Sequence, residues 1–347
     1  MRRFLITFLT LIFTAVMFAS TAFAATEITG AGATFPYPLY SKWFSEYQKV
    51  NKEVQINYQS IGSGGGIRQF LEKTVDFGAS DAPMTDEQLK KSPVTVHHIP
   101  TTLGAVVLTY NLVEVKGDLK LDGEIIADIF LGKITKWNDP RLVKLNPTLK
   151  LPDQALMVAH RSDGSGTTNI FADYLAKVSP TWKEKVGVGT ALNWPVGLGG
   201  KGNEGVAGLV KQTPGSIGYV ELIYAASNKL PVASVKNRAG VFVKPETKAV
   251  TAAAANFLKK TPKKDFPEDF RMSITDAEGK DSYPISSFTY LLVYGKQNGI
   301  KGSNLVKFLN WAIYDGQKLS AALEYAPLPK ELVTKIDAKI KKIEVTK

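Results

Sequence analysis

The sequence LMVAHRSDGSGTTNIFADYL, residues 156–175, places a short apolar run, a glycine-rich turn and an amphipathic pattern next to one another. Residues 156–159 form a strand candidate, and the apolar side chains between Ile170 and Leu175 recur with the spacing of one helix face. Further strand candidates are residues 54–58, 94–99, 105–110 and 217–220, and further helical patterns follow glycine-rich turns near residues 36 and 66. This alternation predicts an α/β architecture.

The composition is that of a globular protein without cysteine. The 347 residues include 43 Lys and Arg, 32 Asp and Glu, three His and no Cys, so the formal net charge is +11. With 44% hydrophobic and 22% charged residues the chain is neither disordered nor collagen-like, and the lack of Cys excludes disulfides, thiolate metal sites and cysteine nucleophiles. We expect no metal and no cofactor. The positive charge leaves nucleic acid, an anionic membrane surface and an anionic small ligand open as partners.

The N-terminus has the pattern of a secretory signal. Arg2 and Arg3 precede an apolar run over residues 4–18, and Ala22-Phe23-Ala24 has the small-x-small pattern of a cleavage site. The run is shorter than the roughly 20 residues of a spanning helix, which argues against the alternative of a retained membrane anchor. We therefore predict that residues 1–24 are removed after Ala24 and that the mature chain lies in the periplasm, where nucleic acid is not an expected partner.

The mature chain is too long for one ordinary core. Removal of the first 24 residues would leave 323 residues and lower the net charge from +11 to +9. Single hydrophobic cores usually stop growing at about 250 to 300 residues. Two lobes are therefore expected.

Three segments place glycines and hydroxyl groups directly before an amphipathic helix. They are GAGATFP (residues 30–36), IGSGGG (residues 61–66) and RSDGSGTT (residues 161–168). A helix N-terminus presents unpaired N–H groups and about half a positive charge, and glycine lets a ligand approach the backbone. Each turn alone could serve only as a helix cap. Three of them, one beginning with Arg161, favour a site for a tetrahedral oxyanion.

A fourth segment, FGASDAP (residues 77–83), brings in a carboxylate. Ionised Asp81 can only accept hydrogen bonds, so it would repel sulfate but retain hydrogen phosphate, which has an O–H to donate. The alternative interpretation is a helix N-cap, because Pro83 and the acidic pair Asp86 and Glu87 follow.

Taken together, these segments resemble the substrate-binding proteins of high-affinity phosphate ABC transporters. The resemblance rests on TGAGATFP (29–36), VDFGASDAP (75–83) and DGSGT (163–167), which resemble that family's ligand segments. It also rests on NWPVGLGGKGN (193–203) and PGSIGYV (214–220), which resemble family signatures away from the ligand. It covers the chain from about Thr29 to the region of Pro329. It implies a two-lobed, type II-like periplasmic binding protein fold of the α/β class, with two hinge crossings and phosphate enclosed between the lobes.

The resemblance also implies the binding residues and the lobe boundaries. The phosphate-binding residues would be Thr34, Phe35, Ser63, Asp81, Arg161, Ser165, Gly166 and Thr167, with Asp163 as the partner of Arg161. One lobe would comprise residues 25–103 and 285–347 and the other residues 104–284, with Pro100 and Pro284 near the crossings. Two departures from the family pattern are Gly64, where a second serine is common, and His160, which we expect to be a packing residue.

The implied function is that of an exported, non-catalytic receptor, monomeric in solution, which captures inorganic phosphate and delivers it to a membrane permease. One alternative is the same fold tuned to another oxyanion such as sulfate or arsenate. Another is an exported phosphatase or serine hydrolase, but Ser63 and Ser165 do not fit the G-x-S-x-G pattern of a nucleophile turn. A third is nucleotide binding by GKGNEG (residues 200–205), which fits G-x-G-x-x-G but follows no apolar strand pattern.

Overall fold

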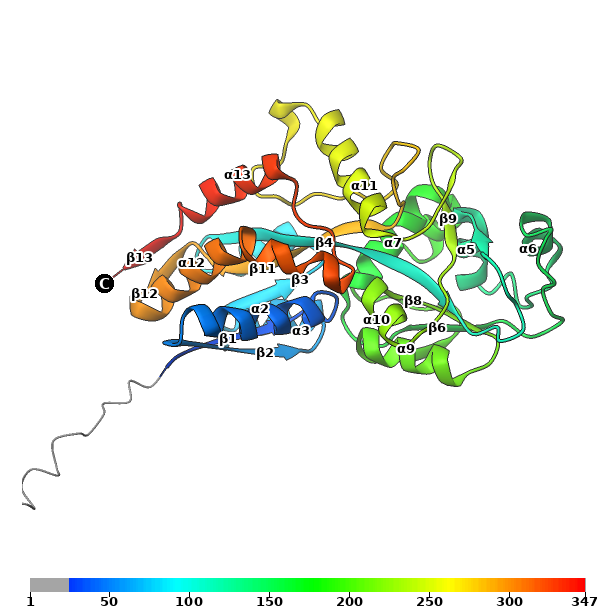
Figure 1. Cartoon of the computed structure of the whole chain (residues 1–347), viewed down its shortest axis with the longest axis horizontal. Coiled ribbons are helices and arrows are strands. Elements are labelled where there is room, and N and C mark those ends of the chain that lie inside the picture. Colours follow the sequence, from blue (N-terminus) through cyan, green and yellow to red (C-terminus); the bar gives the residue numbers. More distant parts are fainter. Residues whose placement is uncertain (1–24, 347) are drawn as a thin grey trace, which may run out of the picture.

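The structure, a computed structural model, describes residues 25–346. The predicted signal, residues 1–24, lies outside the described residues. Figure 1 shows an elongated molecule whose strands run along the long axis, with helices packed around both ends. Among residues 25–346, every helix is too short or too polar to cross a membrane.

The core of the molecule is an eight-stranded mixed sheet with the strand order β2-β1-β3-β11-β4-β8-β6-β7. Its strands are β1 (Thr26–Gly32), β2 (Val54–Ser60), β3 (Phe77–Ser80), β4 (Val96–Tyr110), β6 (Met157–Arg161), β7 (Leu198–Gly200), β8 (Ser216–Glu221) and β11 (Ser286–Tyr294). The pairs of β1 with β2 and β3, and of β6 with β7 and β8, are parallel. The pairs that involve β11 or β4 are antiparallel. The predicted α/β fold class is confirmed.

Strand β4 runs through the middle of the sheet and corrects one expectation. Residues 94–99 and 105–110 were expected to form two strands, but a single strand of 15 residues replaces them. Residues 96–105 pair with β11 and residues 106–110 with β8. Pro100, which lacks an N–H, lies beside the register shift between Thr289 and Tyr290, and a proline is tolerated in a strand at such an irregularity.

The strands on either side of β4 define two halves of the sheet. We call β1, β2, β3 and β11 the β1 half, and β6, β7 and β8 the β8 half. In Figure 1 these lie at opposite ends of the molecule, and β4 extends from one end toward the other. This arrangement is that of a two-lobed fold.

The helices surround both halves. They are α2 (Tyr37–Val50), α3 (Ser63–Leu71), α4 (Asp86–Lys90), α5 (Gly123–Phe130), α6 (Pro140–Leu145), α7 (Gly166–Val178), α8 (Pro180–Lys185), α9 (Gly202–Gln212), α10 (Leu222–Ser227), α11 (Thr247–Lys260), α12 (Gly299–Ile313) and α13 (Lys330–Ile340). Short 3-10 helices span Lys263–Asp265, Gly316–Leu319 and Ala321–Leu323. Two small sheets contain β5 (Lys120–Leu121), β9 (Ser234–Lys236) and β10 (Phe242–Val243), and β12 (Lys296–Asn298) with β13 (Glu344–Thr346).

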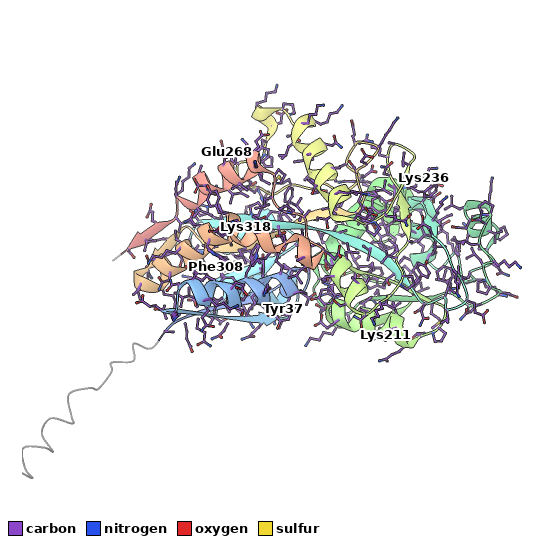
Figure 2. All side chains as sticks on the ribbon, in the orientation of Figure 1. Tyr37, Lys211, Lys236, Glu268, Phe308 and Lys318 are labelled. Atoms are coloured by element: carbon purple, nitrogen blue, oxygen red, sulfur yellow. The ribbon has the colours of Figure 1, made fainter. Side chains whose placement is uncertain are left out.

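The apolar stripes predicted from the sequence face the core. Trp43, Phe44 and Tyr47 of α2 are buried, and the rings of Phe44 and Tyr47 contact Phe308 of α12 at centroid distances of 5.5 and 5.3 Å. Phe308 is labelled in Figure 2, where side chains fill the space between the helices and the sheet. Helix α2 is thus fixed against α12, and this packing holds the turn that precedes α2 in place.

Candidate anion-binding site

The predicted site residues converge where the two halves of the sheet meet. Thr34, Ser63 and Asp81 follow strands β1, β2 and β3, whereas Arg161 ends β6 and Thr167 lies in the first turn of α7. The side chains of all five residues are buried. The carboxyl ends of strands from both halves therefore meet at one place, as expected for a ligand site in an α/β protein.

Two of the three glycine-rich turns begin a helix with a predicted site residue. Ser63 is the first residue of α3, and Ser165 is the N-cap of α7, where its Oγ accepts a hydrogen bond of 3.0 Å from the backbone N of Thr168. The backbone N of Ser165 donates to Thr190 O at 2.7 Å. The Ser165 hydroxyl is thus a helix cap. Ser63 and Gly166 are the first residues of α3 and α7, where the positive end of each helix dipole lies.

The third turn orients Thr34 and Phe35. The backbone O of Thr34 accepts hydrogen bonds from Tyr37 N at 3.2 Å and from the hydroxyl of Tyr224 at 2.5 Å. The backbone O of Phe35 accepts from the hydroxyl of Tyr325 at 2.6 Å, and its ring is fully buried. Since the Phe35 side chain is part of the core, only its backbone can serve a ligand.

Asp81 is a carboxyl group inside the protein. Its Oδ1 accepts a hydrogen bond of 2.8 Å from the hydroxyl of Thr289, and its backbone N donates to Ser63 Oγ at 3.2 Å. Burial raises the pKa of Asp81 to about 7, although Thr289, Arg161 and Ser63 oppose the shift by favouring the ionised form. Near neutral pH this group can either accept or donate a proton, which is an unusual property for an aspartate.

Arg161 is held by a bidentate ion pair with Asp163. Its Nε donates to Oδ1 at 2.8 Å and its Nη2 to Oδ2 at 2.5 Å, and only 1% of the Arg161 side chain is exposed. Burial acts to raise the pKa of Asp163, but the hydrogen bonds from Arg161 and from the backbone N of Gly202 outweigh it and lower the pKa. The guanidinium charge is therefore largely balanced before any ligand arrives, as expected from the sequence.

The positive charge of the chain is spread over its surface. Lys211, Lys236 and Lys318, labelled in Figure 2, are exposed and lie in different regions of the molecule. Salt screens such charges beyond about 10 Å at 0.1 M. The site must therefore attract an anion mainly through its own dipoles and hydrogen-bond donors.

The two halves touch through glycines. The backbone N of Gly64 donates to Gly164 O at 2.8 Å, and a β-carbon on Gly64 would lie 3.0 Å from the Cα of Gly164. At Gly166 a β-carbon would come within 2.5 Å of both Asp81 Oδ2 and Ser63 Oγ. Glycine is required at Gly166 for the halves to approach this closely.

One residue in the site was missed by the sequence reasoning. Asn203 lies in the segment 193–203, which was placed away from the ligand, yet its Nδ2 donates to Thr34 Oγ1 at 2.7 Å and to Thr167 Oγ1 at 3.2 Å. No apolar strand precedes GKGNEG, as expected, but the short strand β7 (Leu-Gly-Gly) ends at Gly200 and α9 begins at Gly202. This fourth glycine-rich turn before a helix was the available signal.

His160, the other departure in the sequence, packs as expected. Its ring stacks on Trp194 at a centroid distance of 4.7 Å and an interplanar angle of 12°. Within residues 25–346, His, Asp and Glu form no cluster of three or more that could hold a metal ion.

Comparisons with known proteins show which family the chain belongs to. A family model described as the PBP superfamily domain matches residues 19–315. The phosphate-binding protein PstS of Pasteurella multocida (strain Pm70) is 47% identical over 331 residues, which cover 94% of each chain. The PstS of Haemophilus influenzae (strain ATCC 51907 / DSM 11121 / KW20 / Rd) is 46% identical over 319 residues, covering 91% of this chain and 93% of its own.

Solved structures share the fold. A phosphate-binding protein from Stenotrophomonas maltophilia has a TM-score of 0.71 at 20% identity and covers 90% of this chain and 93% of its own. An ABC-type phosphate transport receptor from Vibrio cholerae has a TM-score of 0.57 at 16% identity, with 87% and 100% covered. At these identities the likeness concerns the two-lobed α/β architecture alone.

Proposed function

The chain belongs to the PBP superfamily and, within it, to the PstS phosphate-binding proteins, and on this premise we propose how it works. It is the substrate-binding protein of a phosphate ABC transporter. It captures inorganic phosphate between the two halves of its sheet and hands it to the membrane permease. Its place is the periplasm, which it reaches through cleavage of residues 1–24 after Ala24, and it acts as a monomer.

The observation that carries the proposal is a buried carboxyl group among hydrogen-bond donors at two helix N-termini. Asp81 lies beside Ser63 and Gly166, where an anion site would otherwise contain donors only. An acceptor in such a site favours an anion that still has a proton, which hydrogen phosphate has and sulfate lacks at neutral pH. Sulfate binding at this site is therefore not favoured.

The other predicted site residues would make the remaining contacts with phosphate. Backbone N–H groups of Thr34, Phe35, Ser63, Gly166 and Thr167, together with the hydroxyls of Thr34, Ser63 and Thr167, donate to the phosphate oxygens. The segment at Ser165 closes one side and caps α7. Arg161 supplies the cationic group, and Asp163 fixes its guanidinium plane through the bidentate pair.

Phosphate joins two moving lobes in this proposal. Residues 25–103 and 285–347 form one lobe and residues 104–284 the other. The strand pairing supports a boundary here, because Ala105 is the last residue of β4 that pairs with β11 and Val106 the first that pairs with β8. Since Thr34 and Asp81 lie on one lobe and Arg161 on the other, phosphate makes all its contacts only in the closed state and shifts the equilibrium toward it.

No catalytic step is needed for this role, and none is proposed. The hydroxyl of Ser63 accepts from Asp81 N and that of Ser165 caps α7, so neither serine is paired with a histidine base. Phosphate is released unchanged, with no cofactor, metal or nucleic acid involved. Incubation with a phosphomonoester should give no phosphate release.

Isothermal titration of the mature chain, freed of bound phosphate, tests the proposal. At pH 8 phosphate should bind tightly with one site per chain, and sulfate at a thousandfold higher concentration should neither release heat nor compete. Arsenate, which keeps a proton, should compete with phosphate. Tight sulfate binding, or no heat with phosphate, would overturn the assignment.

A further inference from the structure

Asn203 lies inside the site and joins its two halves. It is the second residue of α9, is fully buried, and contacts Thr34 in the turn before α2 and Thr167 in α7. We propose that Asn203 is a positioning residue that fixes the hydroxyls of Thr34 and Thr167 as hydrogen-bond donors toward the anion. This inference rests on the proposed phosphate-binding function and assigns to it a residue outside the recognised ligand segments.

The orientation of the Asn203 amide follows from one neighbour. The backbone N of Glu221 lies 2.9 Å from the side-chain Oδ1. A backbone N–H can only donate, so the atom that faces it must be the amide oxygen. The NH₂ group is therefore turned toward the two threonines, and its two hydrogens serve one hydroxyl each.

Thr34 Oγ1 receives two hydrogen bonds from Asn203. The side-chain Nδ2 lies at 2.7 Å and the backbone N at 3.2 Å. A hydroxyl has two acceptor lone pairs and one proton to donate. With both lone pairs occupied, the proton of Thr34 must point away from Asn203 and is available for another acceptor.

Thr167 Oγ1 is occupied in the same way. It receives a hydrogen bond of 3.2 Å from Asn203 Nδ2 and one of 3.3 Å from Arg161 Nη1. Its hydroxyl proton is likewise left to donate elsewhere. Asn203 thus imposes one hydrogen-bond polarity on two hydroxyl groups from opposite halves of the sheet.

This polarity complements that of Asp81. The two threonine hydroxyls can only donate, so they suit phosphate oxygens that have no proton. The ionised carboxyl of Asp81 can only accept, so it suits the one oxygen that has a proton. The bound anion would therefore have a single preferred orientation, with its O–H toward Asp81.

The contact also depends on closure. Thr34 is on the β1 half, and Asn203 and Thr167 are on the β8 half. When the halves separate, the bonds to Thr34 must break, and its hydroxyl regains freedom to rotate. The hydroxyl of Thr167, on the same half as Asn203, stays fixed when the halves separate, which lowers the ordering cost of binding, whereas the hydroxyl of Thr34 is fixed only as the halves close.

A double-mutant cycle with Thr34→Val tests the proposal. Phosphate affinity is measured by isothermal titration at pH 8 for the mature chain, Asn203→Ala, Thr34→Val and the double variant. Asn203→Ala removes the hydrogen bonds from the amide to Thr34 and Thr167. We expect the Kd for phosphate to rise about 10- to 100-fold above that of the unsubstituted chain. In the Thr34→Val background, the fold increase in Kd caused by Asn203→Ala should be at least five times smaller, because one of the two hydroxyls that Asn203 contacts is absent.

Controls separate positioning from folding. Asn146 is a buried asparagine whose Nδ2 donates to Lys120 O and Leu142 O, away from the site. Asn146→Ala should lower the melting temperature of the ligand-free chain without changing the phosphate Kd. Asn203→Ser is measured as well, because serine is well suited to a helix N-terminus. If the Asn203→Ala chain does not fold, the predicted loss of phosphate affinity is tested with Asn203→Ser.

Two results would overturn the role of Asn203. One is an unchanged Kd in a folded Asn203 variant. The other is an equal loss with and without Thr34→Val, which would show that Asn203 acts by placing α9. Failure of the proposed function would be visible separately, because the unsubstituted chain would then give no phosphate heat.

Discussion

Gly166 faces the carboxyl group of Asp81 so closely that a β-carbon on Gly166 would lie 2.5 Å from Asp81 Oδ2. The two residues come from opposite halves of the sheet. The distance between these two residues therefore depends on how far the two halves are closed. A side chain at residue 166 would prevent the halves from closing to this distance.

Gly166→Ala should weaken phosphate binding at least 100-fold, because closure would force the new methyl group into Asp81 and Ser63 Oγ. The ligand-free chain, free to remain open, should melt within a few degrees of the unsubstituted chain. Gly208→Ala in α9 is the matched control, since no atom lies within 4 Å of its added β-carbon. It should leave Kd unchanged and stabilise the fold by up to about 1 kcal/mol. Equal affinities of the two variants would contradict this closure requirement.

Asp81→Asn should reduce the discrimination against sulfate. The amide can donate as well as accept, so an unprotonated sulfate oxygen would find a donor where the parent chain has a carboxylate. We expect sulfate to compete with phosphate measurably at pH 8, with phosphate affinity itself lowered about 10-fold or more. The measurement is competitive titration with both anions. Full retention of selectivity would show that Asp81 is not the proton acceptor.

The stability of the ligand-free chain should depend on pH through Asp81. Burial raises the pKa of Asp81 from 3.8 to about 7, so between about pH 4 and pH 7 the folded chain keeps a proton that the unfolded chain releases. The contribution of Asp81 to stability is therefore full below pH 4, is lost as the pH rises to about 7, and is then constant.

Comparison with Asp81→Asn isolates this effect, because asparagine does not titrate. The unfolding free energy of the parent relative to the variant should fall by on the order of 4 kcal/mol between pH 4 and pH 8. Urea unfolding in phosphate-free buffers measures it. Burial, the main cause that raises the pKa of Glu221, acts in both chains, and only the smaller contribution from the charge of Asp81 is lost in the variant. A constant difference across this range would mean that Asp81 titrates normally.

Asp163→Ala should destabilise the protein by about 2 to 4 kcal/mol, because it leaves the buried Arg161 guanidinium without its partner. The control is Asp153→Ala, which removes the 2.7 Å pair with Lys136, in which both side chains are more than half exposed. That exposed pair should contribute less than about 1 kcal/mol. Urea unfolding at pH 7.5 compares the two variants, and similar values would mean that the Arg161 pair contributes no more than a surface pair.

Much of the site was predictable because its chemistry is local in sequence. Ser63, Asp81 and Arg161 each lie in a short segment where glycines, a hydroxyl or a charge directly follow a strand. The resemblance to the family and the order of these segments then brought them together. The structure buries all three side chains and places the hydroxyl of Ser63 against the backbone N of Asp81.

Asn203 was not predictable in the same way. Its role depends on which atoms α9 brings next to Thr34 and Thr167, and these are separated from it by 169 and 36 residues. The turn before α9 has the glycine pattern of the other turns, but β7 is too short to give an apolar run. The continuity of β4 was not predictable either, because it depends on a register shift in the pairing with β11 that accommodates Pro100.

Strand β4 has a further consequence for the cooperativity of unfolding. Two lobes on separate sheets could melt one after the other. Here residues 96–105 and 106–110 of one continuous strand belong to the ladders of both halves, so disorder that begins in either half removes support from the other. We expect a single calorimetric transition, in which a molecule that works as two moving parts unfolds as one thermodynamic unit.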